Sequence, residues 1–282
     1  MKKPQFPIWP AATVRLKGNL KRMSTSNKAS GVVFVLGVAH CGSTLLGRML
    51  DTHARMLCVG EMARIDRCLE QSLPCRCGEP LALCPIWSRF LPVIQAEGTN
   101  FRRFSYPLYS RIRELSGKDV IVDISKTRIY RMTRRWSDNG EKYIFLIRDP
   151  RGVLAAAVRS GKDLEKSLRK TKKWTSRLHR FAEKKGKRTL RVYYEDLAAR
   201  PEAELRRICG FLGIDFAPEM LRPSDKVHHF ISGSTSDYLQ GSNEIRVDER
   251  WRAALAAEQI RRIEQMMRGV DLFSSRYLAP DL

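Results

Sequence analysis

Short apolar runs alternate with helix-like patterns along most of this chain. Residues 31–37 are apolar and β-branched between glycines, which is typical of a buried strand of a parallel sheet. Residues 45, 46, 49 and 50 are apolar at the spacing of one helix face, so a tight turn and a helix follow that strand. The alternation predicts an α/β fold, with a central parallel sheet flanked by helices. Further apolar runs cover residues 56–60, 119–124, 143–148 and 190–194, and helix patterns follow the last two at about 151–160 and 202–212.

Three longer segments complete the pattern. Residues 162–188 carry twelve Lys or Arg and three acidic residues, and we expect a long basic helix there. Trp174 and Leu178 lie on one face of it, so we interpret them as core contacts rather than as a base-stacking surface. Residues 228–247 are polar and rich in Gly and Ser, which indicates a long loop, and loops of that length are often functional. Residues 248–268 return to a helical pattern.

One domain accounts for most of the chain. Residues 1–30 contain seven Lys or Arg and no acidic residue. We favour a flexible basic tail there over a membrane-surface segment around Trp9 and Leu16. Residues 31–282 then form a single domain with a cysteine-rich insert at about residues 68–87.

The charge of the chain points to an anionic partner. Lys and Arg total 52 against 30 Asp and Glu, which gives a formal charge of +22. Such a field attracts nucleotides, nucleic acids, acidic glycans and anionic membranes alike. The apolar run at 32–38 is too short to cross a bilayer, and no signal-peptide pattern is evident. We therefore expect a protein of the cytoplasm or of the membrane surface.

A phosphate-binding loop is encoded between the first strand and the first helix. Residues 37–44 match G-x-x-x-x-G-K-[ST] at every fixed position except one, because Ser43 stands where the lysine belongs. Backbone N–H groups of such a turn bind anions together with the helix N-terminus. Without the lysine that holds the β- and γ-phosphates, a ligand with one 5′-phosphate or phosphosulfate fits better than ATP. The alternative is a glycine-rich turn that binds nothing.

Four blocks of sequence resemble the sulfotransferases that use 3′-phosphoadenosine-5′-phosphosulfate (PAPS), in particular the tyrosylprotein and bacterial carbohydrate-type enzymes. The resemblance spans residues 31 to about 255 and implies a P-loop-like, nucleotide-binding sulfotransferase fold. In chain order, the blocks are His-Cys-Gly-Ser-Thr-Leu-Leu at 40–46 with Asp-Thr-His at 51–53 and Gly-Glu at 60–61, Asp-Ile-Ser-Lys at 123–126, Arg-Asp-Pro-Arg at 148–151, and a strand–helix unit at 192–214.

The resemblance implies roles for three residues in sulfuryl transfer. Glu61, which follows an apolar run, is the expected general base. Lys126 is expected to contact the bridging oxygen or the 5′-sulfate. His40 stands where the family commonly has Arg or Lys, and we expect nearby phosphate and sulfate to raise its pKa. The alternatives are a surface glutamate, a surface lysine and a histidine that caps the turn.

The same resemblance implies the nucleotide-binding residues. Arg148 is expected to bind the 3′-phosphate with two hydrogen bonds, and an ordinary salt bridge is the alternative. The family usually has Ser eight residues further on, where this chain has Ala156, and Ser160 one helical turn later is expected to substitute. Tyr194 and the loop at 228–241 are weaker candidates for packing on the nucleotide. The other expected contacts come from His40, Cys41, Gly42, Ser43, Thr44 and Leu45.

These motifs predict partners and leave two alternatives. PAPS is the implied co-substrate, no metal is expected, and the acceptor is a hydroxyl or amine of a carbohydrate, a lipid-linked molecule or a small molecule. The basic surface favours an acidic or membrane-associated acceptor, and no nucleic-acid-binding motif is evident. One alternative is a P-loop nucleoside triphosphatase or kinase, for which Asp123 is a possible Mg²⁺ ligand. The other is a non-catalytic relative that only binds an anion.

The seven cysteines suggest reduced thiols, since their number is odd and no secretory signal is evident. Cys75, Cys77 and Cys84 lie close together in sequence, and Cys68 could add a fourth thiolate. Four thiolates could hold zinc, but the spacing C-x-C-x6-C is unusual for a zinc ribbon. We favour plain structural cysteines, with zinc binding and a redox or disulfide role as alternatives.

Overall fold

The structure, a computed structural model, describes residues 31–134, 136, 139–233, 242–274 and 276–278. The tail expected at residues 1–30 and residues 234–241 of the expected loop lie outside this range. The single domain expected over residues 31–282 stays a prediction.

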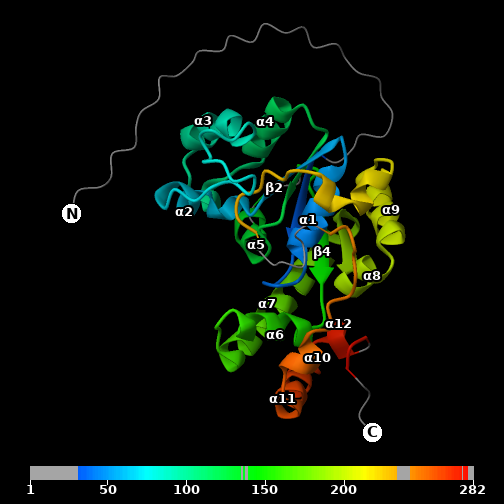
Figure 1. The fold of residues 1–282 in the computed structure, drawn as a ribbon. Coiled ribbons are helices and arrows are strands. Elements are labelled where there is room, and N and C mark those ends of the chain that lie inside the picture. Colours follow the sequence, from blue (N-terminus) through cyan, green and yellow to red (C-terminus); the bar gives the residue numbers. More distant parts are fainter. Residues whose placement is uncertain (1–30, 135, 137–138, 234–241, 275, 279–282) are drawn as a thin grey trace, which may run out of the picture.

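A five-stranded sheet runs through the centre of the fold (Figure 1). Its order is β2-β3-β1-β4-β5, and every neighbouring pair is parallel. The first four strands are buried along almost their whole length, because helices cover both faces, and this explains their continuous apolar runs. The predicted α/β fold with a central parallel sheet is confirmed. The strands are β1 (Val32–Leu36), β2 (Met56–Gly60), β3 (Val120–Asp123), β4 (Lys142–Ile147) and β5 (Thr189–Tyr193).

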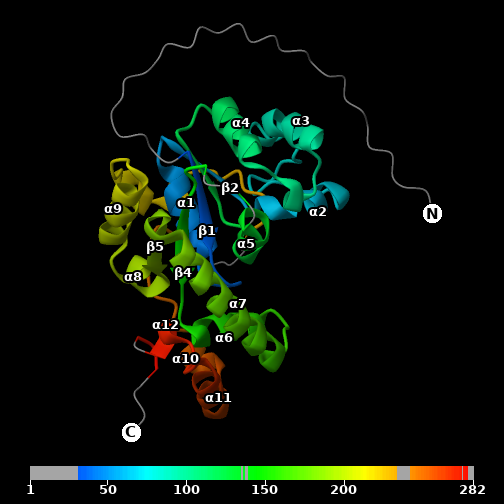
Figure 2. The ribbon, with the colours of Figure 1, turned by 180° about the vertical axis from the view of Figure 1, so that it is seen from behind.

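Two layers of helices enclose the sheet. The layer that contains α1 lies in front of the sheet in Figure 1, and the layer that contains α7 lies in front of it in Figure 2. The α1 layer comprises α1 (Ser43–Thr52), α8 (Tyr194–Ala199) and α9 (Pro201–Leu212). The α7 layer comprises α4 (Tyr106–Ser116), α5 (Thr127–Thr133) and α7 (Leu164–Lys185).

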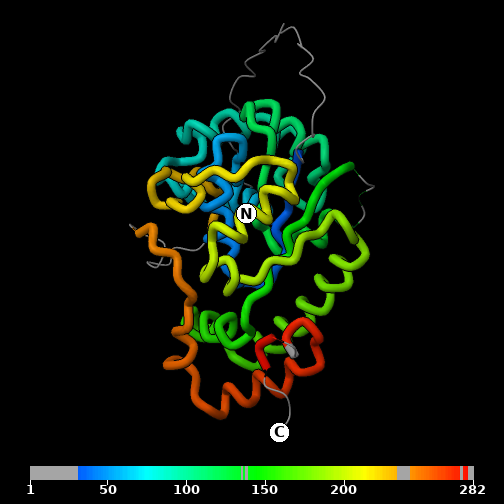
Figure 3. Tube along the Cα trace, turned by 90° about the vertical axis from the view of Figure 1, so that its right-hand side faces the viewer, coloured from blue at the N-terminus to red at the C-terminus, as the bar shows by residue number. Residues whose placement is uncertain are grey.

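The remaining helices gather at opposite ends of the molecule, as Figure 3 shows. At one end α3 packs on α4, and at the other the C-terminal helices lie beside α6 and α7. None of the helices in the described part of the chain is long and apolar enough to cross a membrane. These helices are α2 (Ile65–Glu70), α3 (Trp87–Glu97), α6 (Pro150–Arg159), α10 (Trp251–Ala254), α11 (Ala257–Met267) and α12 (Asp271–Ser274).

Aspartates begin the helices α6 and α7. The Asp149 side chain accepts a hydrogen bond from the Arg151 N–H at 2.8 Å, and Pro150 supplies the first residue of α6. The Asp163 side chain accepts from the Lys166 N–H at 2.7 Å and begins α7. The expected long basic helix is therefore confirmed, and its Trp174 and Leu178 side chains are buried.

The helical pattern expected over residues 248–268 is present as two separate helices, α10 and α11. Leu255 and Ala256 adopt extended backbone conformations, which separate α10 from α11. The Gln259 side chain accepts a hydrogen bond from the Ala256 N–H at 2.9 Å and so starts the second helix. The hydrophobic period continues across this break, so the pattern alone suggested one helix.

Phe34 on β1 is the centre of an aromatic cluster. Its side chain is fully buried, and its ring lies 5.1 Å from Tyr109, 5.6 Å from Trp136 and 5.9 Å from Tyr143, measured between ring centres. Aromatic side chains at these distances contribute packing beyond their buried area.

Replacing Phe34 with Ala should lower the free energy of unfolding by about 3–5 kcal/mol, because a large cavity would open in the core. Urea denaturation monitored by circular dichroism measures this change. Leu83→Ala is the control, since Leu83 is 70% exposed, and we expect a change of about 0.5 kcal/mol or less. Equal losses in the two variants would contradict the assignment of Phe34 to the core.

Candidate active site

A cavity of about 540 Å³ opens at the carboxyl edge of the sheet. Its volume is within the range of about 300–1,000 Å³ that small-molecule and cofactor sites occupy. Each strand contributes a residue to its lining: His40 follows β1, Glu61 follows β2, Lys126 follows β3, Arg148 follows β4 and Tyr194 follows β5. Because the strands are parallel, their carboxyl ends meet at this edge, where open α/β sheets bind ligands.

The lining of the cavity is strongly cationic. Side chains that carry positive charge outnumber the carboxylates by six to two. Such a surface concentrates anions, and its low-dielectric walls strengthen the attraction. The cations are Arg64, Lys126, Arg148, Arg159, Lys162 and Arg250, and the carboxylates belong to Glu61 and Asp248.

Two glycines allow the phosphate loop to fold tightly. Gly42 has a φ of +92°, and a Cβ atom there would lie 2.4 Å from the Tyr194 ring. A Cβ atom at Gly37 would lie 2.6 Å from the Cys41 sulfur. The loop leads directly into α1, whose first residues line the cavity, so its backbone is suited to binding an anion. The loop and helix residues in the lining are Ala39, His40, Gly42, Ser43, Thr44 and Leu45.

Cys41 is the predicted loop residue that the structure does not bring into the cavity lining. Its side chain is fully buried beneath the loop, against Gly37. Burial raises the pKa of its thiol, so the sulfur stays protonated at neutral pH. The Cys41 side chain therefore packs against the loop, and a contact between its backbone N–H and the nucleotide stays a prediction.

Glu61 and Lys126 form a buried ion pair. The Lys126 Nζ atom lies 2.5 Å from Glu61 Oε1, and Arg64 Nε lies 2.5 Å from Glu61 Oε2. Burial alone would raise the pKa of Glu61, but the attraction of Lys126 and Arg64 outweighs it and holds the pKa below its ordinary value. The carboxylate is therefore ionised at neutral pH.

The backbone of Lys126 is strained. Its φ of +59° and ψ of −120° are unusual for a residue with a side chain, and such conformations cost on the order of 1–3 kcal/mol. The conformation occurs at the turn between β3 and α5, where the side chain reaches Glu61. Strain of this kind persists where the surrounding structure fixes a functional side chain.

Asp123 and Ser125, from the same sequence block as Lys126, form hydrogen bonds that hold the turns carrying Glu61 and Lys126. The Asp123 carboxylate accepts hydrogen bonds from the Tyr109 hydroxyl at 2.6 Å and from the Ser125 N–H at 2.7 Å. Ser125 Oγ in turn accepts a bond from the Ala63 N–H at 3.0 Å, in the turn after Glu61. Burial raises the pKa of Asp123 to about 6. Because Asp123 is fully buried and outside the lining, it is badly placed to bind the Mg²⁺ of a nucleoside triphosphatase.

Arg148 connects three parts of the site. Its NH1 group donates to the His40 carbonyl at 3.0 Å, and its NH2 group lies 2.9 Å from the Asp248 carboxylate. The guanidinium also stacks 4.3 Å above the Tyr194 ring. Arg148 therefore forms the salt bridge that was the alternative, and it also lines the cavity; its contact with a 3′-phosphate stays a prediction.

Asp248 is held ionised by its two arginine partners. The hydrogen bonds from Arg250 and from Arg148 outweigh the effect of burial and keep the pKa of Asp248 well below its usual range. This carboxylate therefore fixes the orientation of Arg148 in the cavity lining.

His40 is held in its neutral form by the protein around it. Its backbone has a φ of +64°, and its Nε2 atom lies 3.1 Å from Lys162 Nζ. Burial and then the charges of Lys162 and Lys126 lower the pKa of His40 to about 4. Because an ammonium group can only donate, Nε2 accepts its hydrogen bond and the ring proton lies on Nδ1. The protein's own groups thus shift this pKa in the opposite direction to the shift expected from a bound phosphate.

The end of α6 brings Ser160 to the cavity. Ser160, Ala156 and Arg159 all line it, and the role of Ser160 as a substitute for the family serine at position 156 stays a prediction. The Ser160 hydroxyl donates to the Ala157 carbonyl at 2.8 Å, which leaves its oxygen able to accept a bond.

Several lining residues were not predicted. Arg64 could have been found, since it lies three residues after Glu61. Lys162 lies two residues after Ser160, but we expected it to belong to the long basic helix over residues 162–188 and so did not assign it to the site. Asp248 and Arg250 reach the cavity from a segment with no local motif. Of the loop expected at 228–241, residues 232 and 233 line the cavity.

Part of this chain is similar in sequence to known sulfotransferases. Residues 140–218 match the model of the family described as the sulfotransferase family. Protein-tyrosine sulfotransferase A from Caenorhabditis elegans is 27% identical over 226 residues, which cover 73% of this chain and 56% of that relative. This chain therefore spans little more than half of the relative's length.

Two solved structures share the fold. The sulfotransferase domain from the curacin biosynthetic pathway is 22% identical, with a TM-score of 0.60, and the match covers 85% of this chain and 98% of that domain. The sulfotransferase domain from the Synechococcus PCC 7002 olefin synthase is 20% identical, with a TM-score of 0.56, and the match covers 88% and 98%. The chain is therefore similar to sulfotransferases in sequence over part of its length, and it shares its fold with two sulfotransferase domains.

Proposed function

We propose that this protein transfers a sulfuryl group from PAPS to an acceptor hydroxyl or amine. The proposal rests on the residues that line one cavity. They include a phosphate loop without the usual lysine and six cations, one of which, Lys126, is paired with the ionised Glu61. The match of residues 140–218 to the sulfotransferase family supports the reaction type, and the carboxylate and the cations in the lining are of the kinds that this reaction needs.

PAPS carries two anionic groups, and the lining offers a place for each. The backbone of the loop and the start of α1 suit the 5′-phosphosulfate. Arg148, Ser160 and Arg159 lie at the ends of β4 and α6, where they could bind the 3′-phosphate. Tyr194, beneath Arg148, is the candidate for contact with the nucleoside.

Sulfuryl transfer moves one group from an oxygen of the donor to an oxygen or nitrogen of the acceptor. The acceptor atom forms a bond to sulfur while the bond from sulfur to the 5′-phosphate oxygen breaks, and that oxygen leaves with the electron pair as adenosine 3′,5′-bisphosphate (PAP). Glu61 takes the acceptor proton, because its carboxylate is ionised at neutral pH. Lys126 donates a hydrogen bond to the leaving oxygen, where negative charge develops.

The acceptor is proposed only by class. The cationic lining favours a carbohydrate, lipid-linked molecule or small molecule that carries its own negative charge. The name of the nematode relative adds a tyrosine peptide to the acceptors worth testing.

Radiolabelled [³⁵S]PAPS offered with a panel of acceptors tests the proposal. The panel should contain an anionic glycan, an anionic lipid, a phenol, an amine and an acidic tyrosine peptide. We expect label on at least one acceptor. Glu61→Gln should reduce that turnover by about 10²- to 10⁴-fold, because the general base is lost, while PAP binding changes little.

Glu97→Gln is the matched control, because Glu97 is exposed at the end of α3, and it should turn over like the wild type. If no acceptor is labelled and PAP does not bind, the proposed function is wrong. If Glu61→Gln is as active as the wild type, Glu61 is not the base.

The protonation of His40 provides a second test. In histidine NMR spectra, with the signal assigned by His40→Asn, its imidazole should stay neutral until the pH falls to about 4. Lys162→Met should raise this pKa toward the ordinary value of about 6.5, because a neighbouring cation is removed. Inorganic sulfate should also raise it if an anion binds in the loop. A His40 that titrates near 6.5 in the wild type, without response to either change, would contradict this site.

A further inference from the structure

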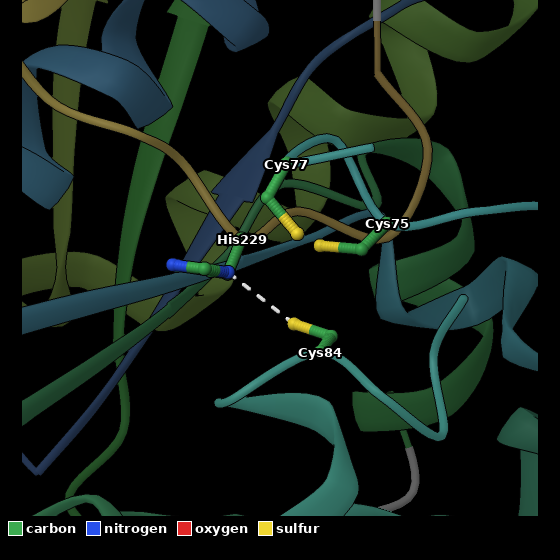
Figure 4. Close-up of side chains that lie close together, drawn as sticks. All are labelled: Cys75, Cys77, Cys84 and His229. Carbon is green, nitrogen blue, oxygen red and sulfur yellow. Dashed lines mark hydrogen bonds between the residues drawn. The ribbon is translucent and has the colours of Figure 1, made fainter. Parts of the chain in front are cut away.

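Four side chains outside the cavity lining gather around a common point. Cys75, Cys77, Cys84 and His229 each direct one potential ligand atom inward, and these atoms all lie within 4.8 Å of one another (Figure 4). The Cys84 sulfur lies 3.3 Å from His229 Nδ1. Cys75 and Cys84 are almost completely buried.

We propose that this cluster binds one zinc ion as a structural site with three cysteine ligands and one histidine. Tetrahedral zinc with Zn–S bonds of about 2.3 Å and Zn–N bonds of about 2.0–2.1 Å places its ligands about 3.8 Å apart for two sulfurs and about 3.6 Å apart for sulfur and nitrogen. The four atoms are already close to this spacing, so small side-chain rotations are enough. A site with four protein ligands is closed, as structural zinc sites are.

The fourth ligand differs from the one expected. Cys68 was the candidate from the sequence, but it lies on α2 outside the cluster, and His229 takes its place from 145 residues after Cys84. The neighbouring His228 is occupied elsewhere, because its two nitrogens lie 2.7 Å from the Asp51 carboxylate and 2.7 Å from the Pro223 carbonyl. The cluster therefore argues against the expectation that this protein has no metal.

The backbone holds the ligands in position. Gly78, with a φ of +96°, forms a turn in which its N–H donates to the Cys75 carbonyl at 2.9 Å. The Cys84 N–H donates to the Pro80 carbonyl at 2.9 Å. The buried Trp87 indole donates to the His229 carbonyl at 2.8 Å and fixes the histidine beside the cysteines. Outer hydrogen bonds of this kind orient metal ligands.

The proposed site also braces one wall of the active-site cavity. Two residues after His229, Ile231 accepts a hydrogen bond from the Glu61 N–H at 2.7 Å and donates one to the Val59 carbonyl at 3.2 Å. Arg76, between two of the cysteines, donates to the carbonyl of Gly233 at 2.5 Å. Zinc would therefore tie the cysteine-rich insert to the segment that holds the backbone of Glu61.

Metal analysis of the full chain, purified without chelators, tests this site. We expect about one zinc per chain by elemental analysis. After exchange, Co²⁺ should give the absorption of a tetrahedral site together with intense sulfur-to-cobalt bands. Cys84→Ser should weaken metal binding at least tenfold, whereas His229→Cys should retain the metal. The control Cys68→Ser, at a buried cysteine outside the cluster, should retain it as well.

Three results would overturn the proposal. The first is a wild-type protein that contains no stoichiometric zinc and gives no tetrahedral Co²⁺ spectrum. The second is equal metal loss in Cys68→Ser and Cys84→Ser, and the third is a disulfide within the cluster, found by mass spectrometry. The cobalt spectrum uses the unaltered chain, so a variant that fails to fold leaves the test intact. Because no readout depends on sulfuryl transfer, this inference can fail while the proposed function stands.

Discussion

Because all five strands run in the same direction, each must deliver its carboxyl end, and the loop that follows, to one edge of the sheet. This constraint gathers residues that are far apart in sequence. The loop at His40, the turn at Glu61, the turn at Lys126 and the helix start after Arg148 come from four different strands. Their shared cavity is a consequence of topology, and its chemistry depends on which side chains stand at those four positions.

Gathering six cations around one cavity has an electrostatic cost, and the protein offsets part of it locally. Lys126 is paired with Glu61, and Arg148 is paired with Asp248. His40 adds no further charge, since burial and the nearby cations lower its pKa to about 4. The remaining positive field is what an anionic ligand would neutralise, so the same charges that limit stability favour binding.

Local patterns in the sequence were enough to predict the phosphate loop and the positions of several residues at the sheet edge. Glycines around a short apolar run predicted the phosphate loop, and the runs ending at Glu61 and Lys126 predicted their position at the sheet edge. Local sequence patterns did not predict contacts between residues that are far apart in the chain, because only the tertiary structure brings such residues together. Asp248 contacts Arg148, which lies 100 residues away in sequence, and His229 contacts Cys84, which lies 145 residues away. No sequence pattern around Asp248 or His229 predicts these contacts. The break at Leu255 was missed because the apolar period continues through it.

We propose that this cavity recognises an adenosine nucleotide by its 3′-phosphate, through the cations at the ends of β4 and α6. Calorimetric titration of the wild type and of Arg148→Met with PAP and with 5′-AMP tests it most directly. We expect the wild type to bind PAP at least tenfold more tightly than 5′-AMP and Arg148→Met to lose most of this preference. Equal affinities for the two nucleotides in the wild type, unchanged by the substitution, would contradict it.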